Sequence, residues 1–550
     1  MAAPDRDALS RNAPLVLLAV AMGAAAAVLL SYGSGLTFFQ DSWEFLMNRR
    51  DPTVAALFGP HNEHIVVIPV LVELLTLRLF GMESMTPELV VLVALLLGAA
   101  GCVFVYVRRR LGPWLALFMT TLLLFFGPAW QDFLWPFQIG FAGSALCGLA
   151  ALLLLEGEGP RRDPAACALL ALAIGFSSLG LPFAAAAAVE ILLRCREHGL
   201  RRLYVVAVPL LLYGAWYLGW GHTAQSSLSV DNVLSSPRYV GEGIVSSLDA
   251  LLALGTIGDE VVGRSKWGLP LLGVLLALVA YGQLRRPGFP RGLWPALAAT
   301  AGFWFLAAFN TMPGREPYSS RYLYIGALFF ILVAANLLER VRLDRRGLLV
   351  AGAVTVVVAG FNLTPLREGR DFFEEESVLT RADLGAIEIA SRTVDPAFRL
   401  SPEVAGTTYL VDVEAGEYLQ AVWEYGSPAY SPAELAGAPE EGRRQADVVL
   451  ANALPLGIET GLAPEPVSGA CVRAAAGEDL PLRPGVTTIH FPAGAEGAVR
   501  LRRFAAGYPL RTEGLAGGST ARLFVPRDRS RRPWRLQVEP PRVTRVCKPA

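Results

Sequence analysis

Hydrophobic and polar residues alternate in long blocks over the first two thirds of the chain. Eleven apolar stretches lie near residues 13–33, 88–107, 114–129, 138–155, 165–179, 181–194, 203–220, 267–284, 292–309, 322–339 and 347–363. Most approach the roughly 20 residues with which a helix crosses the hydrocarbon of a bilayer. The pattern predicts a polytopic α-helical membrane protein with about 11 transmembrane helices.

The break between the fifth and sixth stretches fits either a kink in one helix or a turn between two. It contains Gly180, Leu181 and Pro182. A turn is predicted, because it keeps the arginines at 194–202 on the same side as the other basic loops. The first stretch has no small-residue cleavage site close behind it, which favours a retained anchor over a signal peptide.

Arginine-rich loops recur at every second connection between the apolar stretches. They hold residues 108–110, 161–162, 194–202, 285–291 and 340–346. Basic residues in short loops stay in the cytoplasm, so the N-terminus is predicted to be cytoplasmic. The alternate loops, which include 39–44, 61–64, 130–138, 226–265 and 315–321, are then outside, together with everything after the last span.

Two outer segments are apolar without resembling full spans. Residues 65–80 contain Glu73 and Arg78, and residues 230–257 are interrupted by Ser, Asp249 and Gly. Both are predicted to be amphipathic helices that lie on the membrane surface and roof a cavity at its level.

Hydrophobicity stops near Pro365, which divides the sequence into a membrane domain, 1–365, and an extracytoplasmic α+β domain, 366–550. The second domain is predicted to be helical over 377–455, where Thr380 to Asp383 and Ser431 to Glu434 fit capping boxes and Gly426 ends a helix. It is predicted to be β-rich over 466–550 and to end in a small β-sandwich. The expected strands are 486–491, 499–504, 521–525, 534–538 and 543–547.

Composition narrows the class further. Hydrophobic residues make up 53% of the chain and the formal net charge is zero, so no electrostatic footprint for nucleic acid exists. Nearly all basic residues are arginine, which is typical of a GC-rich bacterial source. Cys471 and Cys547 are the only cysteines after the last span, and either a disulfide or two free thiols fits their position outside.

Asp41 and Glu44 follow the first span almost immediately. Phe38, Phe39 and Trp43 flank Asp41, and partial desolvation there would raise its pKa and suit it to general-base catalysis. The alternative is an ordinary polar loop that begins with an aromatic belt.

His61, Glu63 and His64 are packed into four residues ahead of an apolar helix. With Asp41, the two histidines are candidate ligands for a divalent metal. A loop cluster that shapes the cavity by hydrogen bonding fits equally well.

The short outer turn 127–138 carries Asp132, Trp135 and Gln138. Trp135 is either an interfacial anchor or a stacking surface for a sugar ring, and Asp132 and Gln138 are placed to bind hydroxyl groups.

A second outer loop holds Arg315, Arg321 and Tyr322, where arginine is otherwise sparse. Arginine at the mouth of a membrane cavity suits a phosphate, but pairing with Glu316 or with lipid headgroups also fits.

Together these features resemble the GT-C class of integral-membrane glycosyltransferases, and most closely the bacterial relatives of the protein mannosyltransferase and aminoarabinose transferase group. The resemblance covers about residues 10–365 and rests on four features in order. They are Asp41 after the first span, the segment from His61 to the Leu79-Phe80-Gly81 end of its helix, the turn Trp135 to Gln138, and Ser320-Arg321-Tyr322 at the tenth span. Many members of that group carry two adjacent acids, whereas Ser42 and Trp43 separate Asp41 from Glu44 here, which leaves the role of Glu44 and any metal requirement open.

The resemblance implies a multi-pass protein of the bacterial plasma membrane that transfers a sugar, with inversion, from a polyprenyl-phosphate donor to an extracytoplasmic acceptor (a glycan, lipid or protein). In this scheme Asp41 is the general base, and Arg321, assisted by Arg315, binds the phosphate of the departing lipid. A lipid or solute transporter remains an alternative, although the spans carry few central charges apart from Glu190. A non-catalytic scaffold of the cell envelope is the third possible function, but it would not require the clustered outer acids and histidines.

Overall fold

The computed structural model describes residues 6–550 apart from 158–160, 196–199, 225, 255–256, 259–260, 263–266, 286, 411–412, 463–469, 494–496, 540–543 and 549–550. The chain divides into two compact units. The first unit comprises Met1–Ser34, Asp51–Thr76 and Thr86–Phe372, and the second comprises Gly35–Arg50, Leu77–Met85 and Phe373–Ala550. The short outer segment that carries Asp41 and Glu44 therefore belongs to the second unit, although the sequence placed all of 1–365 in one domain.

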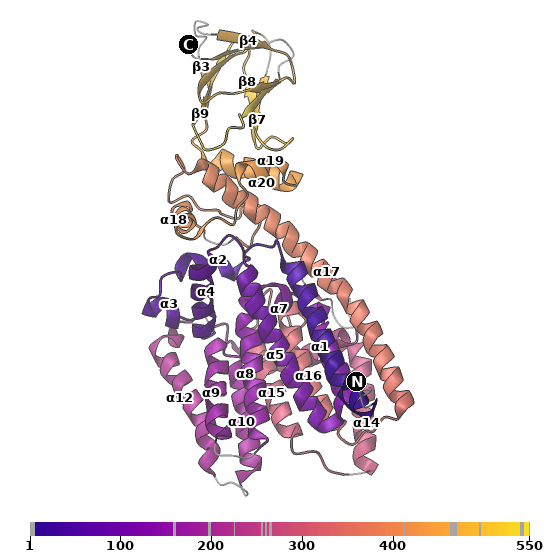
Figure 1. Ribbon diagram of the computed structural model, residues 1–550. Coiled ribbons are helices and arrows are strands. Elements are labelled where there is room, and N and C mark those ends of the chain that lie inside the picture. The colour runs from indigo at the N-terminus through magenta and orange to yellow at the C-terminus, as the bar shows by residue number, and fades with distance from the viewer. Residues whose placement is uncertain are drawn as a thin grey trace, which may run out of the picture. The chain divides into compact units, whose positions relative to one another are not determined.

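The first unit is a bundle of helices (Figure 1). Its helices are α1 Arg6–Gly33, α3 Val54–Phe58, α4 Val67–Phe80, α5 Thr86–Leu111, α6 Pro113–Leu124, η1 Gly127–Ala129, α7 Trp130–Leu134, η2 Pro136–Gln138, α8 Ile139–Leu155, α9 Arg162–Phe176, α10 Gly180–Leu193, η3 Leu200–Leu203, α12 Tyr204–Gly219, η4 Gly221–Thr223, α13 Val230–Leu251, α14 Gly268–Arg285, α15 Leu293–Phe309, α16 Ser320–Leu337 and α17 Arg345–Ala390. Two short strands, β1 Ile257–Gly258 and β2 Val261–Val262, pair between α13 and α14. The last turn of α4 and the C-terminal part of α17 extend into the second unit.

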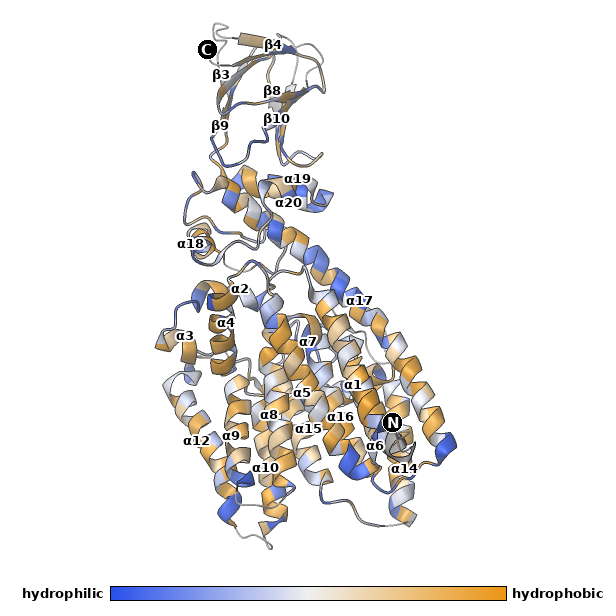
Figure 2. Cartoon of the chain, in the orientation of Figure 1, coloured by the Kyte–Doolittle hydropathy of each residue, from blue (hydrophilic) through white to orange (hydrophobic). Residues whose placement is uncertain are grey.

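Several of these helices are long and apolar enough to cross a membrane. Within the described residues there are six, and a seventh if α6 and the bent segment Gly127–Leu134 form one span. Helices α10, α14 and α15 are apolar but shorter. Figure 2 shows the hydrophobic residues along the bundle and hydrophilic residues at the ends of α9 and α10. The length criterion therefore finds fewer spans than the eleven expected, because several apolar helices fall short of it.

Helices α9 and α10 are separate helices that pack against each other and against α8. The chain turns at Ser177 to Leu179, as predicted in place of a kink. Glycines on α8 allow this close packing, because a Cβ on Gly143 would collide with the ring of Phe176 and one on Gly148 with the ring of Phe183.

Helix α13, predicted to be an amphipathic surface helix, is largely exposed over residues 230–235 and buried over residues 246–251. It packs against α14, α15 and α16. Gly243 lies against the indole of Trp304 on α15, and the hydroxyl of Ser247 lies against Gly326 on α16. Its small and polar residues therefore form a helix–helix interface, and the sequence pattern alone does not distinguish this role from a water-facing side. The last residues of the predicted helix, 255–256, lie outside the described part of the chain.

Two of the basic clusters of the first unit, 108–110 and 194–202, share one network of contacts. Arg110 donates to Glu156 (2.5 Å) and to the side chain of Asn336 (3.0 Å). Arg194 pairs with Glu190 at 2.6 Å and donates to the carbonyl of Glu156. These residues lie near the C-terminal ends of α5, α8, α10 and α16, so the arginine clusters collect at one end of these helices, as the alternation of loops predicted.

The second unit contains one helix from the early chain, further helices after the bundle, and a β region. Its elements are α2 Asp41–Asn48, α18 Ala415–Tyr425, α19 Pro432–Gly437, α20 Glu440–Ala453, β3 Gly457–Leu462, β4 Ala470–Ala474, β5 Asp479–Pro481, β6 Gly485–His490, β7 Gly497–Arg502, β8 Leu510–Leu515, β9 Thr520–Val525, β10 Arg535–Glu539 and β11 Thr544–Lys548. All five expected strands are present within two residues of their expected bounds. Strands β3, β4, β5 and β8 were not predicted from the sequence.

Two antiparallel sheets make up the β region. One has the order β3-β9-β6-β11-β4 and the other β5-β10-β7-β8. Ile489, Leu523 and Val546 of the first sheet are buried, as are Leu501 and Leu536 of the second. The two sheets, each with a buried apolar face, are in agreement with the predicted small sandwich.

The connection after the bundle differs from the prediction. Helix α17 continues through the charged stretch 367–376 to Ala390, so Thr380 begins no helix. Asp383, expected to cap that helix, is buried within α17 and accepts hydrogen bonds from Gly406 N and the Gln445 side chain. The Ser431–Glu434 capping box is present as predicted, and Gly426 ends α18 with a positive φ.

A buried carboxylate joins α20 to the β region. Asp447 accepts hydrogen bonds from the backbone N–H groups of Arg503, Phe504 and Ala505, at 2.8–3.0 Å. Burial raises the pKa of Asp447, and these hydrogen bonds oppose the rise. Arg503 in turn makes a two-pronged ion pair with Asp528, and both side chains are 3% exposed. Asp447 therefore fixes the backbone of the turn after β7, and Asp528 fixes the Arg503 side chain at its start.

A disulfide joins Cys471 on β4 to Cys547 on β11, the two cysteines that the sequence singled out after the last span. The two residues are directly opposite each other in the antiparallel pair. Cys102, Cys147, Cys167 and Cys195 are free. The one bond therefore closes a loop between residues 76 apart in sequence.

Removing this disulfide should destabilise the second unit. Replacing both cysteines with serine releases a long loop in the unfolded chain, at an expected cost of about 2–4 kcal/mol in the free energy of unfolding. Calorimetry of the purified protein with and without reductant measures this loss. A Cys195→Ser control should melt like the wild type. An unchanged transition under reducing conditions would contradict the expectation.

Candidate functional site

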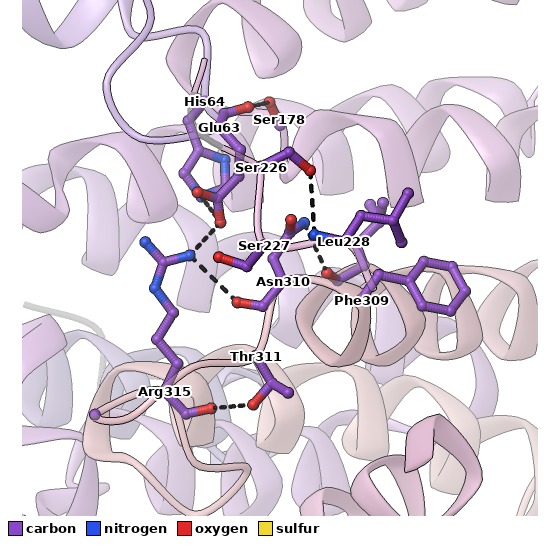
Figure 3. A network of polar contacts seen from close by, with 12 residues as sticks. Glu63, His64, Ser178, Ser226, Ser227, Leu228, Phe309, Asn310, Thr311 and Arg315 are labelled. Carbon is purple, nitrogen blue, oxygen red and sulfur yellow. Dashed lines mark hydrogen bonds and ion pairs between the residues drawn. The ribbon is translucent and has the colours of Figure 1, made fainter. Parts of the chain in front are cut away.

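An ion pair between two distant segments of the first unit forms the centre of the site. Arg315 donates to the Glu63 carboxylate at 2.5 Å and to the carbonyl of Asn310 at 3.4 Å (Figure 3). The Arg315 and Glu63 side chains are only 14% and 18% exposed. Glu63 therefore neutralises Arg315 and holds the loop before α16 against the loop before α4.

Helix α13 holds the Arg315 loop in place. The hydroxyl of Tyr239 donates to the carbonyl of Arg315 at 2.9 Å. The Asn232 side chain donates to the carbonyls of Phe309 and Thr311, at 3.3 and 3.1 Å. The loop conformation that presents the arginines thus depends on a helix that the sequence placed on the membrane surface.

His61 and His64 lie in a tight turn closed by two hydrogen bonds between their own backbones. Asn62, inside this turn, has a φ of 50°, which Asn tolerates better than most residues. The ring of His61 contacts Phe137, and the ring of His64 contacts Phe141. The turn is therefore packed against the segment that connects α7 to α8.

Burial lowers the pKa of His64 to about 4. Glu63, whose carboxylate is 3.9 Å from Nε2, opposes this shift, and Arg315 reinforces it. The ring is therefore neutral at pH 7, and its buried Nδ1 has no hydrogen-bond partner in the described part of the chain. Across the described ranges, no three His, Cys, Asp or Glu side chains form a group that could hold a metal ion. The observed arrangement does not support the predicted metal site at His61 and His64.

The acid sensitivity conferred by His64 should be measurable. Its pKa of about 4 lies below the usual 6.5, so the unfolded chain takes up this proton first as the pH falls. The stability contributed by His64 is therefore complete above about pH 6.5 and lost progressively toward pH 4. We expect His64→Gln to lose less thermal stability than the wild type over this interval, and exposed His222→Gln to behave like the wild type. Parallel Tm–pH curves for wild type and His64→Gln would exclude the effect.

The short helix α7, which packs against α16, and the turn after it carry three of the predicted residues. Trp135 and Gln138 are buried, and Trp135 stacks on Phe137 with ring centroids 5.2 Å apart. The backbone N–H of Gln131 donates to the hydroxyl of Ser320 on α16, at 3.1 Å. Asp132 is 2% exposed, and neither carboxylate oxygen has a hydrogen-bond partner among the described residues.

Arg321 differs from Arg315 in its surroundings. It lies on the first turn of α16, donates to the carbonyl of Gly314 at 2.6 Å, and is positioned over the ring of Tyr322. Its charge acts on Asp132 and on His64, but no described carboxylate forms an ion pair with it. Of the two predicted phosphate-binding arginines, Arg321 alone retains an uncompensated charge in the described structure.

Asp41 and Glu44 belong to the second unit, on the first turn of α2. Glu44 lies 3.7 Å from Arg49, whose guanidinium is largely buried. Trp43, which is fully buried, donates from its indole nitrogen to the carbonyl of Phe38 at 3.0 Å. Asp41 remains partly exposed on this well-packed helix.

All nine predicted substrate-binding residues lie in the first unit, and contacts or charge interactions link eight of them, directly or through Phe137. These are His61, Glu63, His64, Asp132, Trp135, Arg315, Arg321 and Tyr322, and the ninth, Gln138, is buried in the same turn as Trp135. Sequence reasoning missed Asn232 and Tyr239, and it named Ser320 only as part of the motif that opens the tenth span. Asn232 and Tyr239 are seven residues apart, on one face of α13, but the many other polar residues of this helix hide that signal.

The sequence matches no protein-family profile and no curated protein. Among solved structures, the chain is similar to the crystal structure of ArnT from Cupriavidus metallidurans in the apo state. The sequence identity is 16% and the TM-score 0.45, over 73% of this chain and 84% of that chain. At this identity and score, the similarity assigns neither a fold nor an activity to the chain.

Proposed function

We propose that this protein is an integral-membrane glycosyltransferase that moves a sugar from a polyprenyl-phosphate donor to an acceptor outside the bacterial plasma membrane. The observation that carries the proposal is the charge of Arg321, which no described carboxylate pairs with, at the N-terminal end of an apolar helix. A guanidinium there, reinforced by the helix dipole, suits the phosphate of a lipid whose tail remains in the bilayer.

The reaction in this proposal is a direct displacement. An acceptor hydroxyl oxygen forms the new bond to the anomeric carbon of the sugar, and the bond from that carbon to the phosphate oxygen breaks. The proton leaves to a carboxylate base, and polyprenyl phosphate departs with the bonding electrons. Arg321 stabilises the negative charge that develops on the departing phosphate.

Asp41 is the base in this proposal. Its support is its position, on a short helix directly after the first apolar helix, with its side chain partly exposed. Glu44 is assigned a structural part, because it faces the buried guanidinium of Arg49. The neutral ring of His64 and the buried carboxylate of Asp132 are assigned to hydroxyl recognition.

The cysteine distribution supports an outer location for the second unit. Disulfides persist in oxidising compartments and are rare in the cytoplasm. The single disulfide among the described residues lies in the second unit, while the cysteines of the apolar helices are free. In this proposal the acceptor therefore lies on the outer face of the membrane.

A panel assay tests the proposal. Membranes that contain the protein are incubated with radiolabelled polyprenyl-phosphate sugars and an envelope acceptor fraction, beside membranes without it. Transfer of one sugar that depends on the protein is expected. No transfer from any lipid-linked donor, although the protein is folded, would contradict it.

A transporter is the second candidate, favoured by one observation. Asp249 on α13 is 1% exposed, and neither of its carboxylate oxygens has a hydrogen-bond partner in the described part of the chain. Buried acids within membrane helices often mark ion or substrate pathways. Movement of the labelled donor across sealed vesicles without any new glycosidic product would favour this reading.

A further inference from the structure

A basic pocket lies in the second unit, apart from the residues assigned above. Its volume is about 330 Å³, near the lower end of small-molecule sites. It is lined by five arginines and one carboxylate, namely Arg443, Arg502, Arg503, Arg532, Arg535 and Glu440. They come from α20, from the end of β7 with the turn that follows it, and from the start of β10 with the loop before it.

Three of these arginines are already paired with carboxylates. Arg443 pairs with Glu440, and Arg502 with Asp479. Arg503 makes its two-pronged pair with Asp528. The Nε atoms of Arg443 and Arg502 are nevertheless buried without a hydrogen-bond partner in the described structure. These ion pairs therefore leave one N–H group of Arg443 and one of Arg502 without a described partner.

The other two arginines are not paired with any described carboxylate. Arg532 donates from Nε to the carbonyl of Arg503 at 3.0 Å, and its guanidinium is 5.6 Å from the ring centroid of Phe504. Arg535 is exposed at the start of β10. Two positive charges thus remain uncompensated at a concave surface, an arrangement that favours an anion with several acceptor oxygens.

Contacts within the protein hold part of the pocket in place. Asp447 fixes the backbone of residues 503–505, and Asp528 fixes the Arg503 side chain. Fixed donors lose little conformational entropy when they bind a ligand, which raises affinity for a matching group. Surface arginines that merely solubilise the domain need no such support.

We propose that this pocket binds a phosphate group of an anionic envelope glycan, and so holds the acceptor on the same chain as the proposed transferase. The role as acceptor rests on the proposed function, whereas binding of the glycan does not. A glycan is favoured over nucleic acid because the pocket shares its unit with the disulfide, which indicates an oxidising compartment. It is favoured over a lipid surface because its donors line a concavity, whose only large apolar side chain among the lining residues, Phe504, is buried.

Binding of a phosphorylated glycan to the purified full chain tests the proposal. Microscale thermophoresis compares mannopentaose phosphate with mannopentaose, for wild type and Arg532→Gln/Arg535→Gln. We expect binding of the phosphorylated sugar only, weakened about 100-fold in the variant, or about tenfold for each charged donor removed. The matched control, Arg473→Gln/Arg483→Gln, removes the same charge from exposed positions outside the pocket and should bind like the wild type.

Three results would overturn the proposal: equal binding of the neutral sugar, equal loss in the control, or binding to phosphatidylglycerol vesicles alone. The Arg321→Gln variant separates this proposal from the proposed function, because it should bind the phosphorylated glycan normally. If that binding is absent while sugar transfer proceeds, the pocket assignment fails and the transferase stands. If binding depends on the pocket while no donor is used, the transferase fails and the pocket stands.

Discussion

Replacing Arg321 with glutamine should lower the rate of sugar transfer by about 100- to 1,000-fold, the usual cost of removing one donor that stabilises developing negative charge. Arg321 is the arginine of the site without a described carboxylate partner, at the N-terminal end of α16. Glutamine keeps a planar amide of similar reach but removes the charge. Donor KM and kcat in reconstituted membranes measure the effect, and we expect both to change.

Two further variants make the Arg321 result specific. Arg321→Lys keeps the charge but loses the two-pronged geometry, so partial activity is expected. Arg238→Gln removes a 71% exposed arginine of the same unit, paired only with Glu242 on the helix surface, and should leave transfer unchanged. If Arg321→Gln transferred sugar at the wild-type rate with the same KM, its role in phosphate binding would be refuted.

Arg315 is a poor alternative to Arg321 for the phosphate. Its guanidinium already binds Glu63, and a phosphate would have to compete with a buried carboxylate at 2.5 Å. Removing either partner leaves the other charge buried and unpaired, which is costly to stability. The assisting role that the resemblance gave to Arg315 is therefore replaced, in our proposal, by a structural one.

Two pairs of loops that the sequence assigned to the same side contact each other in the first unit, one pair at each end of α8. The arginine clusters at 108–110 and 194–202 contact each other through Glu156, and the histidine turn contacts the turn at 130–138. Both results need only the alternation of loops across a membrane. They do not depend on how the helices pack within it.

Helix packing was the part that the sequence could not supply. The hydrophobic pattern of α13 is that of a surface helix, yet its serines and glycines meet Trp304 and Gly326 on neighbouring helices. Inside a membrane protein, small and polar residues occur at tight helix–helix interfaces as well as on faces that contact water. Helix α17 shows a related limit, because its charged stretch after 366 reads as a linker although the helix continues.

The β region was predicted where strands carry alternating apolar residues. Strands β6, β9 and β10 bury Ile489, Leu523 and Leu536, and their patterns were recognised. Strand β4 has little buried apolar surface, and β8 reads Leu-Arg-Thr-Glu-Gly-Leu, so neither gave a signal. Their place is set by pairing with neighbouring strands, and in β4 by the disulfide to β11.

The second large expected effect concerns Asp41, whose replacement by asparagine should reduce transfer at least about 100-fold, the low end of what a general base contributes. The fold should tolerate the change. Helix α2 is anchored by Trp43, which packs against Phe38 and Tyr418, while the Asp41 side chain stays partly exposed. Equal melting temperatures with lost activity would therefore separate chemistry from folding.

Glu44→Gln is the matched control for Asp41→Asn, since both remove one carboxylate from the same turn of α2. Glu44 offsets the charge of buried Arg49, so its loss should lower the melting temperature and affect transfer only through the amount of folded protein. The pH profile adds a second readout, because a rate that depends on an ionised carboxylate base falls as that base is protonated in acid. If Asp41→Asn kept both the full rate and this acidic limb, the base would have to be another residue.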